Sequence, residues 1–251
     1  MCYKLSLAKS ELQIKQQLFN SFSLDINKIQ DYESYFHRSA DTGQNLFIIK
    51  GDNLNEVLPA TWTLLPEKNI KGLAEGEEMH FEHRLSNIKK DDLFNDELLK
   101  DGMQQRRCLI LADGFFEHLI INEVAQPVYL YKEHRKLFCF VGVYTQVAKD
   151  MYTCSLIVTP VDGENPSQRF FKNQFKMEYL PLIIDPVYIK MWLEAKTTPQ
   201  QLQTLLNNGF SKDRLNVHAV SDQISDNKAY NKPDAIEAVD CPELNLCSET
   251  L

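Results

Sequence analysis

The chain has 251 residues, 43% of them hydrophobic, and carries 35 acidic against 27 basic residues, for a net charge of −8. This acidic balance argues against a protein that coats duplex DNA through bulk electrostatics, but it does not exclude a local basic groove. No run approaches the roughly 18 apolar residues that a membrane helix needs, and charged residues interrupt the N-terminus where a signal core would lie. We therefore expect a cytoplasmic protein with no membrane partner.

The chain begins Met1-Cys2, and the small second residue allows the initiator methionine to be trimmed. A cysteine at the new N-terminus holds a free α-amine close to its thiol. The amine attacks an aldehyde to give a Schiff base, and the thiol then closes a five-membered thiazolidine ring. The α-amine has a reference pKa of about 7.7 to 8.0, so part of it is unprotonated at physiological pH. On this pattern alone, chance or processing is the commoner explanation of a second-position cysteine.

Beyond the N-terminus the chain predicts a single domain over residues 1–239. A first helix is expected over about residues 8–22, and short strands rich in β-branched, aromatic and leucine residues follow it. Several of these strands are apolar throughout, so we expect them to be buried on both faces. The expected strands are Asn45–Lys50, Val57–Leu65, Arg107–Ala112, Pro127–Tyr131, Leu137–Tyr144, Tyr152–Thr159 and Tyr179–Ile184.

Residues 71–96, rich in Glu, Lys and Asn, are expected to form a long loop or an excursion from the core, and long ordered loops inside compact domains are usually functional. Three clusters of basic residues could build a local groove for phosphates, although a solvated face is the more usual explanation of each. The clusters are Arg106-Arg107, Arg84 with Lys89-Lys90, and Arg169 with Lys172 and Lys176.

Residues 106–118 read RRCLILADGFFEH. A buried strand runs into Asp113-Gly114, which is a tight-turn signal, and the next strand begins at Phe115. The carboxylate of Glu117 would lie just past this turn among aromatic residues, where partial desolvation raises a pKa and suits the group to proton transfer. Taken alone, the segment is explained more simply by an ordinary glutamate at a strand end.

The six cysteines include no C-x-x-C pair. Cys108, Cys139 and Cys154 lie in apolar runs, which is typical of reduced cysteines that pack as small hydrophobes. Cys241 and Cys247 lie in a polar tail with no histidine near them, so we expect no metal site.

The C-terminal part predicts helices. Asp185-Pro186 can open a short helix that runs through Trp192 and Leu193. Thr198-Pro199-Gln200-Gln201 forms a capping box with proline at the first helical position, and Gly209 is placed to end that helix. Residues 240–251 are expected to be loosely ordered.

The order of these motifs resembles the SOS-response-associated peptidase family, the abasic-site-processing proteins of bacteria and eukaryotes. Cys2 is followed by RRCLILADGFFEH, which is similar to the family's R-R-C-L-I-P-A-D-G-F-Y-E-W. Arg84 falls at the arginine of N-A-R-x-E. Four further segments resemble family motifs in the same order: residues 62–66 (W-G-L-I-P), 126–129 (Q-P-Y), 140–144 (F-A-G-L-W) and 179–183 (R-M-P-V-I-L).

The resemblance implies an α+β fold with a predominantly antiparallel, barrel-like β core and peripheral helices. It also implies a partner, single-stranded DNA with an abasic site, and no cofactor. By position, Cys2 is the nucleophile and amine donor, and Glu117 assists ring opening and Schiff-base formation. Arg84 holds a DNA phosphate. Trp62 either lies near the DNA-binding cleft, where aromatic faces stack on bases, or packs in the core.

Several departures from the family pattern fall near the chemistry. Ser39 stands where the resemblance predicts an active-site asparagine, and Tyr179 replaces a phosphate-binding arginine. Glu82 and Ser86 replace the Asn and Glu of N-A-R-x-E. The family histidine before R-M-P has no counterpart, since no histidine lies between His134 and His218. The candidates to replace it are Gln174, Lys172 and His118.

Three hypotheses follow. The first is a DNA-damage protein that forms the thiazolidine through Cys2 and Glu117, with Arg84 and the lysines compensating for Glu82. Its candidate DNA-binding residues are Arg84, Trp62, Ser39 and Arg106. The second is a divergent paralogue that has lost catalysis and acts as a binding or scaffold protein. The third is a small-aldehyde scavenger. The family name also implies peptidase activity, which here would be limited to removal of Met1, because no Ser-His-Asp or H-E-x-x-H pattern is present. The oligomeric state is left open.

Overall fold

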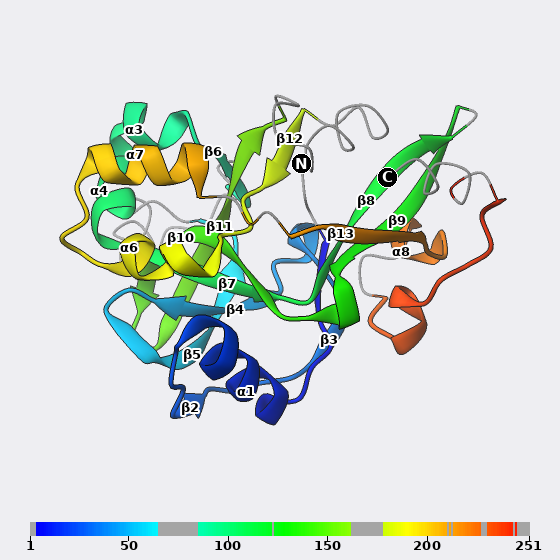
Figure 1. Cartoon of the computed structure of the whole chain (residues 1–251), viewed down its shortest axis with the longest axis horizontal. Coiled ribbons are helices and arrows are strands. Elements are labelled where there is room, and N and C mark those ends of the chain that lie inside the picture. Colours follow the sequence, from blue (N-terminus) through cyan, green and yellow to red (C-terminus); the bar gives the residue numbers. More distant parts are fainter. Residues whose placement is uncertain are drawn as a thin grey trace, which may run out of the picture.

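Two β-sheets form the core of the computed structural model, and helices lie at its periphery (Figure 1). The structure describes residues 4–64, 85–121, 123–161, 178–209, 211, 213–226, 230–242 and 244. Most strand pairs are antiparallel, and three are parallel. The arrangement confirms the α+β fold with a β core and peripheral helices.

The larger sheet has eight strands in the order β12-β11-β10-β7-β4-β5-β2, with β6 paired to β11. Strands β5 and β11 also pair with each other, so β11, β10, β7, β4 and β5 close into a ring. This closure is the barrel-like core that the resemblance implies. The strands are β2 (Lys28–Ile29), β4 (Asn45–Lys50), β5 (Asn53–Trp62), β6 (Asn87–Lys89), β7 (Arg107–Ala112), β10 (Phe138–Ala148), β11 (Met151–Pro160) and β12 (Tyr179–Pro181).

The smaller sheet has five antiparallel strands in the order β13-β9-β8-β1-β3. They are β1 (Lys4–Leu7), β3 (Tyr35–Ser39), β8 (Gly114–Ile121), β9 (Val124–Lys132) and β13 (Leu215–Ala219). The sequence predicts β8 and β9 but none of the other three. Those three are only four or five residues long and mix polar with apolar residues, so their pairing rather than their composition makes them strands.

Side-chain caps set where the principal helices begin. Helix α1 (Glu11–Phe22) starts three residues later than expected, because Ser10 and Gln13 form a capping box across its first turn. Helix α7 (Pro199–Asn208) begins at the predicted box, in which the Thr198 hydroxyl accepts a hydrogen bond from the Gln201 amide. Gly209 ends α7 without a positive φ; a Cβ there would meet the Leu205 carbonyl oxygen at 2.6 Å.

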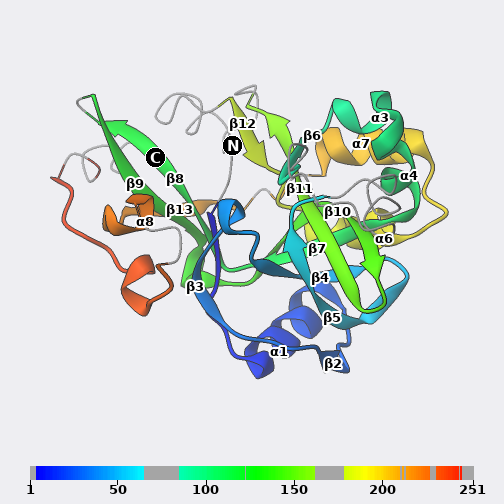
Figure 2. The same ribbon diagram turned by 180° about the vertical axis from the view of Figure 1, so that it is seen from behind.

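The remaining helices divide between the two ends of the molecule. Near α7 lie α3 (Asp92–Asn95), α4 (Glu97–Gln105) and α6 (Ile189–Leu193), while α8 (Gln223–Asp226) lies beside the five-stranded sheet (Figures 1 and 2). The long loop expected over residues 71–96 is wrong for its described part, because β6 and α3 occur there. Residues 71–84 lie outside the described residues.

The tight turn that Asp113-Gly114 signals in the sequence does not join two paired strands. Strands β7 and β8 flank it but belong to different sheets, so the chain crosses here from one sheet to the other. The side chain of Asp113 is 2% exposed. Glycine is needed next to it, because a Cβ on Gly114 would lie 2.1 Å from the Tyr129 ring.

The interior of the larger sheet is stabilised by buried apolar side chains and by the hydrogen bonds of the buried Arg107 side chain. Every residue of β7 is buried, as the continuous apolar run predicts, and Cys108, Cys139 and Cys154 are buried thiols. The guanidinium of Arg107 donates to four carbonyl oxygens, two at the end of α4 and two on residues 192 and 194 around the end of α6. Arg107 is therefore a structural residue rather than part of a basic groove.

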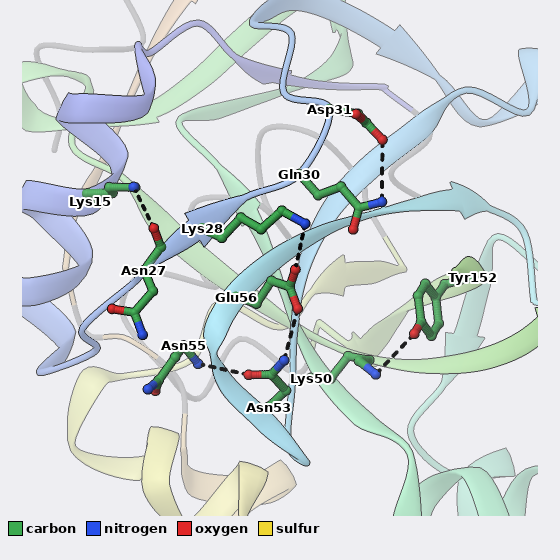
Figure 3. A network of polar contacts seen from close by, with 10 residues as sticks. All are labelled: Lys15, Asn27, Lys28, Gln30, Asp31, Lys50, Asn53, Asn55, Glu56 and Tyr152. Carbon is green, nitrogen blue, oxygen red and sulfur yellow. Dashed lines mark hydrogen bonds and ion pairs between the residues drawn. The ribbon is translucent and has the colours of Figure 1, made fainter. Parts of the chain in front are cut away.

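An exposed polar network fastens β2 to β5 (Figure 3). Lys28 lies 3.5 Å from Glu56, whose second oxygen accepts a hydrogen bond from Asn53 at 2.9 Å. Lys15 on α1 donates to the Asn27 carbonyl just before β2. This network supports the edge of the larger sheet and contains no residue of the candidate site.

Among the described residues, no helix is long and apolar enough to cross a membrane.

Candidate functional site

The pairing of β1 with β8 brings the start of the chain to the strand that carries Glu117. Leu5 lies opposite Phe115, and Ser6 lies opposite Gly114. Glu117 follows Phe115 by two residues, so its side chain leaves the same face of the sheet as Phe115. Lys4, the first residue of β1, is close enough for its positive charge to act on the Glu117 carboxyl group.

The carboxyl group of Glu117 is held in an environment that favours its protonated form. Part of the side chain reaches solvent, but Oε1 is sealed from it and has no hydrogen-bond partner among the described residues. Burial raises the pKa of Glu117 to about 7, and the charge of Lys4 opposes this rise. Both protonation states are therefore populated near neutral pH, which is what a proton-transfer group requires.

His37 is a second unpartnered titratable group on this sheet. It is fully buried on β3, its ring meets the Phe116 ring edge-on at 5.3 Å, and neither ring nitrogen makes a hydrogen bond with a described residue. Burial lowers the pKa of His37 to about 4, and the Lys4 charge lowers it further. The Tyr230 backbone opposes this shift in part. The imidazole is therefore neutral at physiological pH.

Asp113, Ser6 and Tyr129 form a buried hydrogen-bonded chain beside these groups. The Ser6 hydroxyl donates to Asp113 Oδ1 at 2.7 Å and lies 2.8 Å from the Tyr129 hydroxyl. Asp113 Oδ2 accepts from the Ala8 amide at 2.8 Å, and the Asp113 amide donates to the Ser6 carbonyl. Burial raises the pKa of Asp113, although the bonds from Ser6 and Ala8 and the charges of Lys9 and Arg135 oppose the rise.

Two of the candidate DNA-binding residues from the sequence lie in the interior. Trp62 is fully buried and its Nε1 donates to the Ser86 carbonyl at 3.0 Å, which matches the core alternative rather than a stacking surface. Ser39 is also fully buried; its hydroxyl accepts from the Asp41 amide, and its carbonyl accepts from Thr42. Ser39 therefore caps the short turn after β3.

Two other candidates are partly accessible. His118 is half-buried on β8 and its Nε2 lies 3.0 Å from the Ser225 hydroxyl; burial lowers its pKa, with a further contribution from the Lys4 charge. Arg106 is half-buried at the start of β7, and its carbonyl accepts from the Tyr144 amide. Cys2, Arg84, Lys172 and Gln174 lie outside the described residues.

A pocket elsewhere in the fold does not contribute to this site. It has a volume of about 560 Å³, and its lining residues come from α1, the β4–β5 turn and the region of α6. Its lining includes Phe22, Leu24, Leu54, Ile189 and Leu193. The described residues also contain no group of three His, Cys, Asp or Glu side chains arranged to hold a metal ion.

Comparison with known proteins assigns the chain to a family. The family model described as "SOS response associated peptidase (SRAP)" matches residues 1–227. The chain belongs to the SRAP family. It is 26% identical over 215 residues to the abasic site processing protein YoqW of Bacillus subtilis, covering 82% of this chain and 88% of YoqW. It is 22% identical over 148 residues to the yeast abasic site processing protein YMR114C, covering 57% of this chain and 38% of that protein.

A solved structure of low sequence identity has a similar fold. A protein from Bacteroides thetaiotaomicron aligns with a TM-score of 0.69 at 16% identity, over 95% of this chain and all of that one. Within this SRAP fold, sequence reasoning missed the burial of His37 and the hydrogen bonds of Asp113. The only signal for Asp113 was its place in the A-D-G-F block, where turn propensity offered a simpler explanation.

Proposed function

We propose that this chain binds single-stranded DNA at abasic sites and, once Met1 has been removed, joins Cys2 to the ring-opened deoxyribose as a thiazolidine. The observation that carries the proposal is the Glu117 carboxyl group, with a pKa raised to about 7, on the strand that pairs with the N-terminal strand. The SRAP relatives YoqW and YMR114C, both named abasic site processing proteins, support the choice of DNA lesion.

The covalent chain limits how far Cys2 can lie from Glu117. Cys2 precedes Lys4 by two residues, so its Cα lies within about 7 Å of the Lys4 Cα whatever the local conformation. Lys4 in turn is close enough to Glu117 and His37 to shift the pKa of both. A reacting aldehyde carbon on Cys2 is therefore within reach of a group that can donate or accept a proton near pH 7.

The bonds in this reaction balance without a cofactor. The Cys2 amine adds to the deoxyribose aldehyde carbon, and the carbonyl oxygen leaves as water, giving an imine. The thiolate then adds to the imine carbon while the imine nitrogen takes up a proton, which closes the ring. Glu117 is proposed to donate a proton to the departing oxygen and to accept one from the attacking amine. Its nearly even population of the two protonation states suits both transfers.

The test mixes the Met1-processed protein with single-stranded DNA that contains one abasic site, followed by denaturing gel electrophoresis and mass spectrometry. We expect an adduct with the mass of protein plus DNA minus one water. Cys2→Ala should abolish it, whereas Cys241→Ala, which removes a half-buried thiol elsewhere in the chain, should leave it unchanged. Glu117→Gln should slow its formation by about a hundredfold or more.

The same experiment also tests the alternative that the chain is a paralogue that has lost catalysis. Two observations favour that alternative: the net charge of −8 and the absence of a histidine before the R-M-P-like segment. If correctly processed protein gives no adduct while an active SRAP protein reacts under identical conditions, the covalent proposal is wrong. Retained binding of the same DNA in a filter or anisotropy assay would then support a binding role.

A further inference from the structure

The buried aspartate at the crossover between the sheets has more hydrogen bonds than a turn needs. Asp113 accepts from the Ser6 hydroxyl and the Ala8 amide, and its own amide donates to the Ser6 carbonyl. All three bonds lead to β1 or to the residue that follows it, 105 to 107 positions away in the sequence. One residue thus anchors the N-terminal strand from its side chain and its backbone together.

Tyr129 extends this anchor across the sheet. Its hydroxyl lies 2.8 Å from the Ser6 hydroxyl, and its ring passes over Gly114 so closely that any side chain there would overlap it. Because the Ser6 hydroxyl donates to the carboxylate, it accepts the hydrogen bond from Tyr129. Asp113, Ser6 and Tyr129 are all buried, so each partner depends on the others to satisfy its polar atoms. The Asp-Gly pair is therefore explained by this network.

We propose that Asp113 is a positioning residue that fixes the register of β1 against β8 and thereby limits how far from Glu117 the N-terminal cysteine can lie. The reason lies in the geometry of strand pairing, because a slip of one residue turns every side chain of a strand to the other face. β1 has only four residues, and only two of its residues pair with β8, Leu5 with Phe115 and Ser6 with Gly114. The bonds from Asp113 fall on Ser6, one of these two, and on Ala8, just beyond the strand.

This inference rests on the proposed function, since it assigns Asp113 a part in bringing Cys2 and Glu117 together. It does not place Asp113 in contact with the reacting atoms: the carboxylate is occupied by Ser6 and Ala8. Loss of the anchor should therefore slow the covalent step without weakening DNA binding. The slower covalent step would not follow from loss of the negative charge alone, because the Asp113 carboxylate acts through two directed hydrogen bonds.

The test is Asp113→Asn, which keeps the size of the side chain but turns an NH₂ group toward one of two hydrogen-bond donors. We expect the adduct to form at least tenfold more slowly at saturating abasic single-stranded DNA, with an unchanged half-saturating DNA concentration. Asp213→Asn is the matched control: it removes an aspartate charge that pairs with Lys132 at 2.7 Å on the far edge of the sheet. That variant should react at the wild-type rate.

A double-variant comparison separates positioning from general weakening of the fold. If Asp113 acts by keeping Cys2 within reach of Glu117, then Asp113→Asn adds little to the loss caused by Glu117→Gln, and the double variant is no slower than Glu117→Gln alone. The proposal is overturned if the rate losses of the two single variants multiply in the double variant. It is also overturned if Asp113→Asn reacts at the wild-type rate.

If the wild-type protein forms no adduct, the proposed function fails, and amide hydrogen exchange tests the strand anchor directly. Faster exchange of the Leu5 and Leu7 amides in Asp113→Asn, with exchange in β7 unchanged, supports the anchor. Unchanged exchange in β1 overturns it.

Discussion

At the scale of single residues, two titratable groups close to Lys4 are shifted in opposite directions. Glu117 favours its neutral acid form and His37 its neutral base form, because burial disfavours the charged form of each. Lys4 adds to the shift of His37 and opposes that of Glu117. The region around the N-terminal strand therefore holds a carboxyl group that is only partly ionised near pH 7 and an imidazole that is neutral there.

The raised pKa of Glu117 predicts a change in the pH dependence of adduct formation. For the wild-type protein, the rate at saturating abasic DNA should show an inflection near pH 7, where the Glu117 carboxyl group titrates. The Glu117→Gln variant should lose that inflection and keep the one that arises from the Cys2 amine, near pH 8. A stopped-time gel series from pH 5 to 9 measures both profiles, and an inflection near 7 that persists in the variant would assign it to another group.

The lowered pKa of His37 predicts how stability depends on pH. An ordinary value of 6.5 in the unfolded chain against about 4 in the folded protein means that the unfolded chain binds the proton more readily. The contribution of His37 is fully present above pH 6.5 and is lost as the pH falls through 4. The expected loss is roughly 3 kcal/mol.

Glu117 contributes with the opposite sign, since its raised pKa gives stability that is present below 4.5 and lost as the pH rises through 7. The contribution of His37 is therefore measured in the Glu117→Gln background. The free energy of unfolding in urea is compared with and without His37→Phe at pH 7.5, 5.5 and 4.5. The variant with His37 should lose stability over this series, and the variant with Phe should lose markedly less. Parallel curves would contradict the assignment.

At the scale of elements, the best-predicted features are those that depend on neighbours in the sequence. The capping box at Thr198 and the buried run of β7 are local patterns, and both occur as predicted. The short strands β1 and β3 were not predicted, because they have only four and five residues and their hydrogen bonds go to partners far along the chain. The same reason explains Asp113: its sequence signals a turn, while its contacts lie about 105 residues away.

The capping box of α7 gives a prediction at this scale. Thr198→Ala removes the acceptor for the Gln201 amide and should lower the free energy of unfolding by about 1 kcal/mol. Thr204→Ala in the same helix is the matched control: its hydroxyl only donates back to the Gln200 carbonyl, so its loss should change stability by less than about 0.5 kcal/mol. Equal effects in urea unfolding would show that the box contributes nothing beyond helix propensity.

At the scale of the whole molecule, the sequence predicts the class of fold and the strands of the barrel, but not how the two sheets join. Continuous apolar runs indicate β7 and β10 because both faces of these strands are covered. The crossing at Asp113 and the closure of β5 on β11 depend on tertiary pairing that no local pattern encodes. The candidate site lies at such a junction, which is why its hydrogen bonds became visible only with the structure.

Arg107 provides the corresponding test, because it connects elements that are distant in the sequence. Its guanidinium, on a residue only 2% exposed, donates to the carbonyls of Met103, Gln104, Trp192 and Glu194. Lysine would keep the buried charge but lose the planar set of donors, so Arg107→Lys should destabilise the fold by about 3 kcal/mol. Arg135→Lys, on a partly exposed ion pair 3.5 Å from Glu237, should cost less than about 1 kcal/mol. Urea unfolding of both variants decides the matter, since a small loss for Arg107→Lys would mean that packing alone joins α4 and α6 to the barrel.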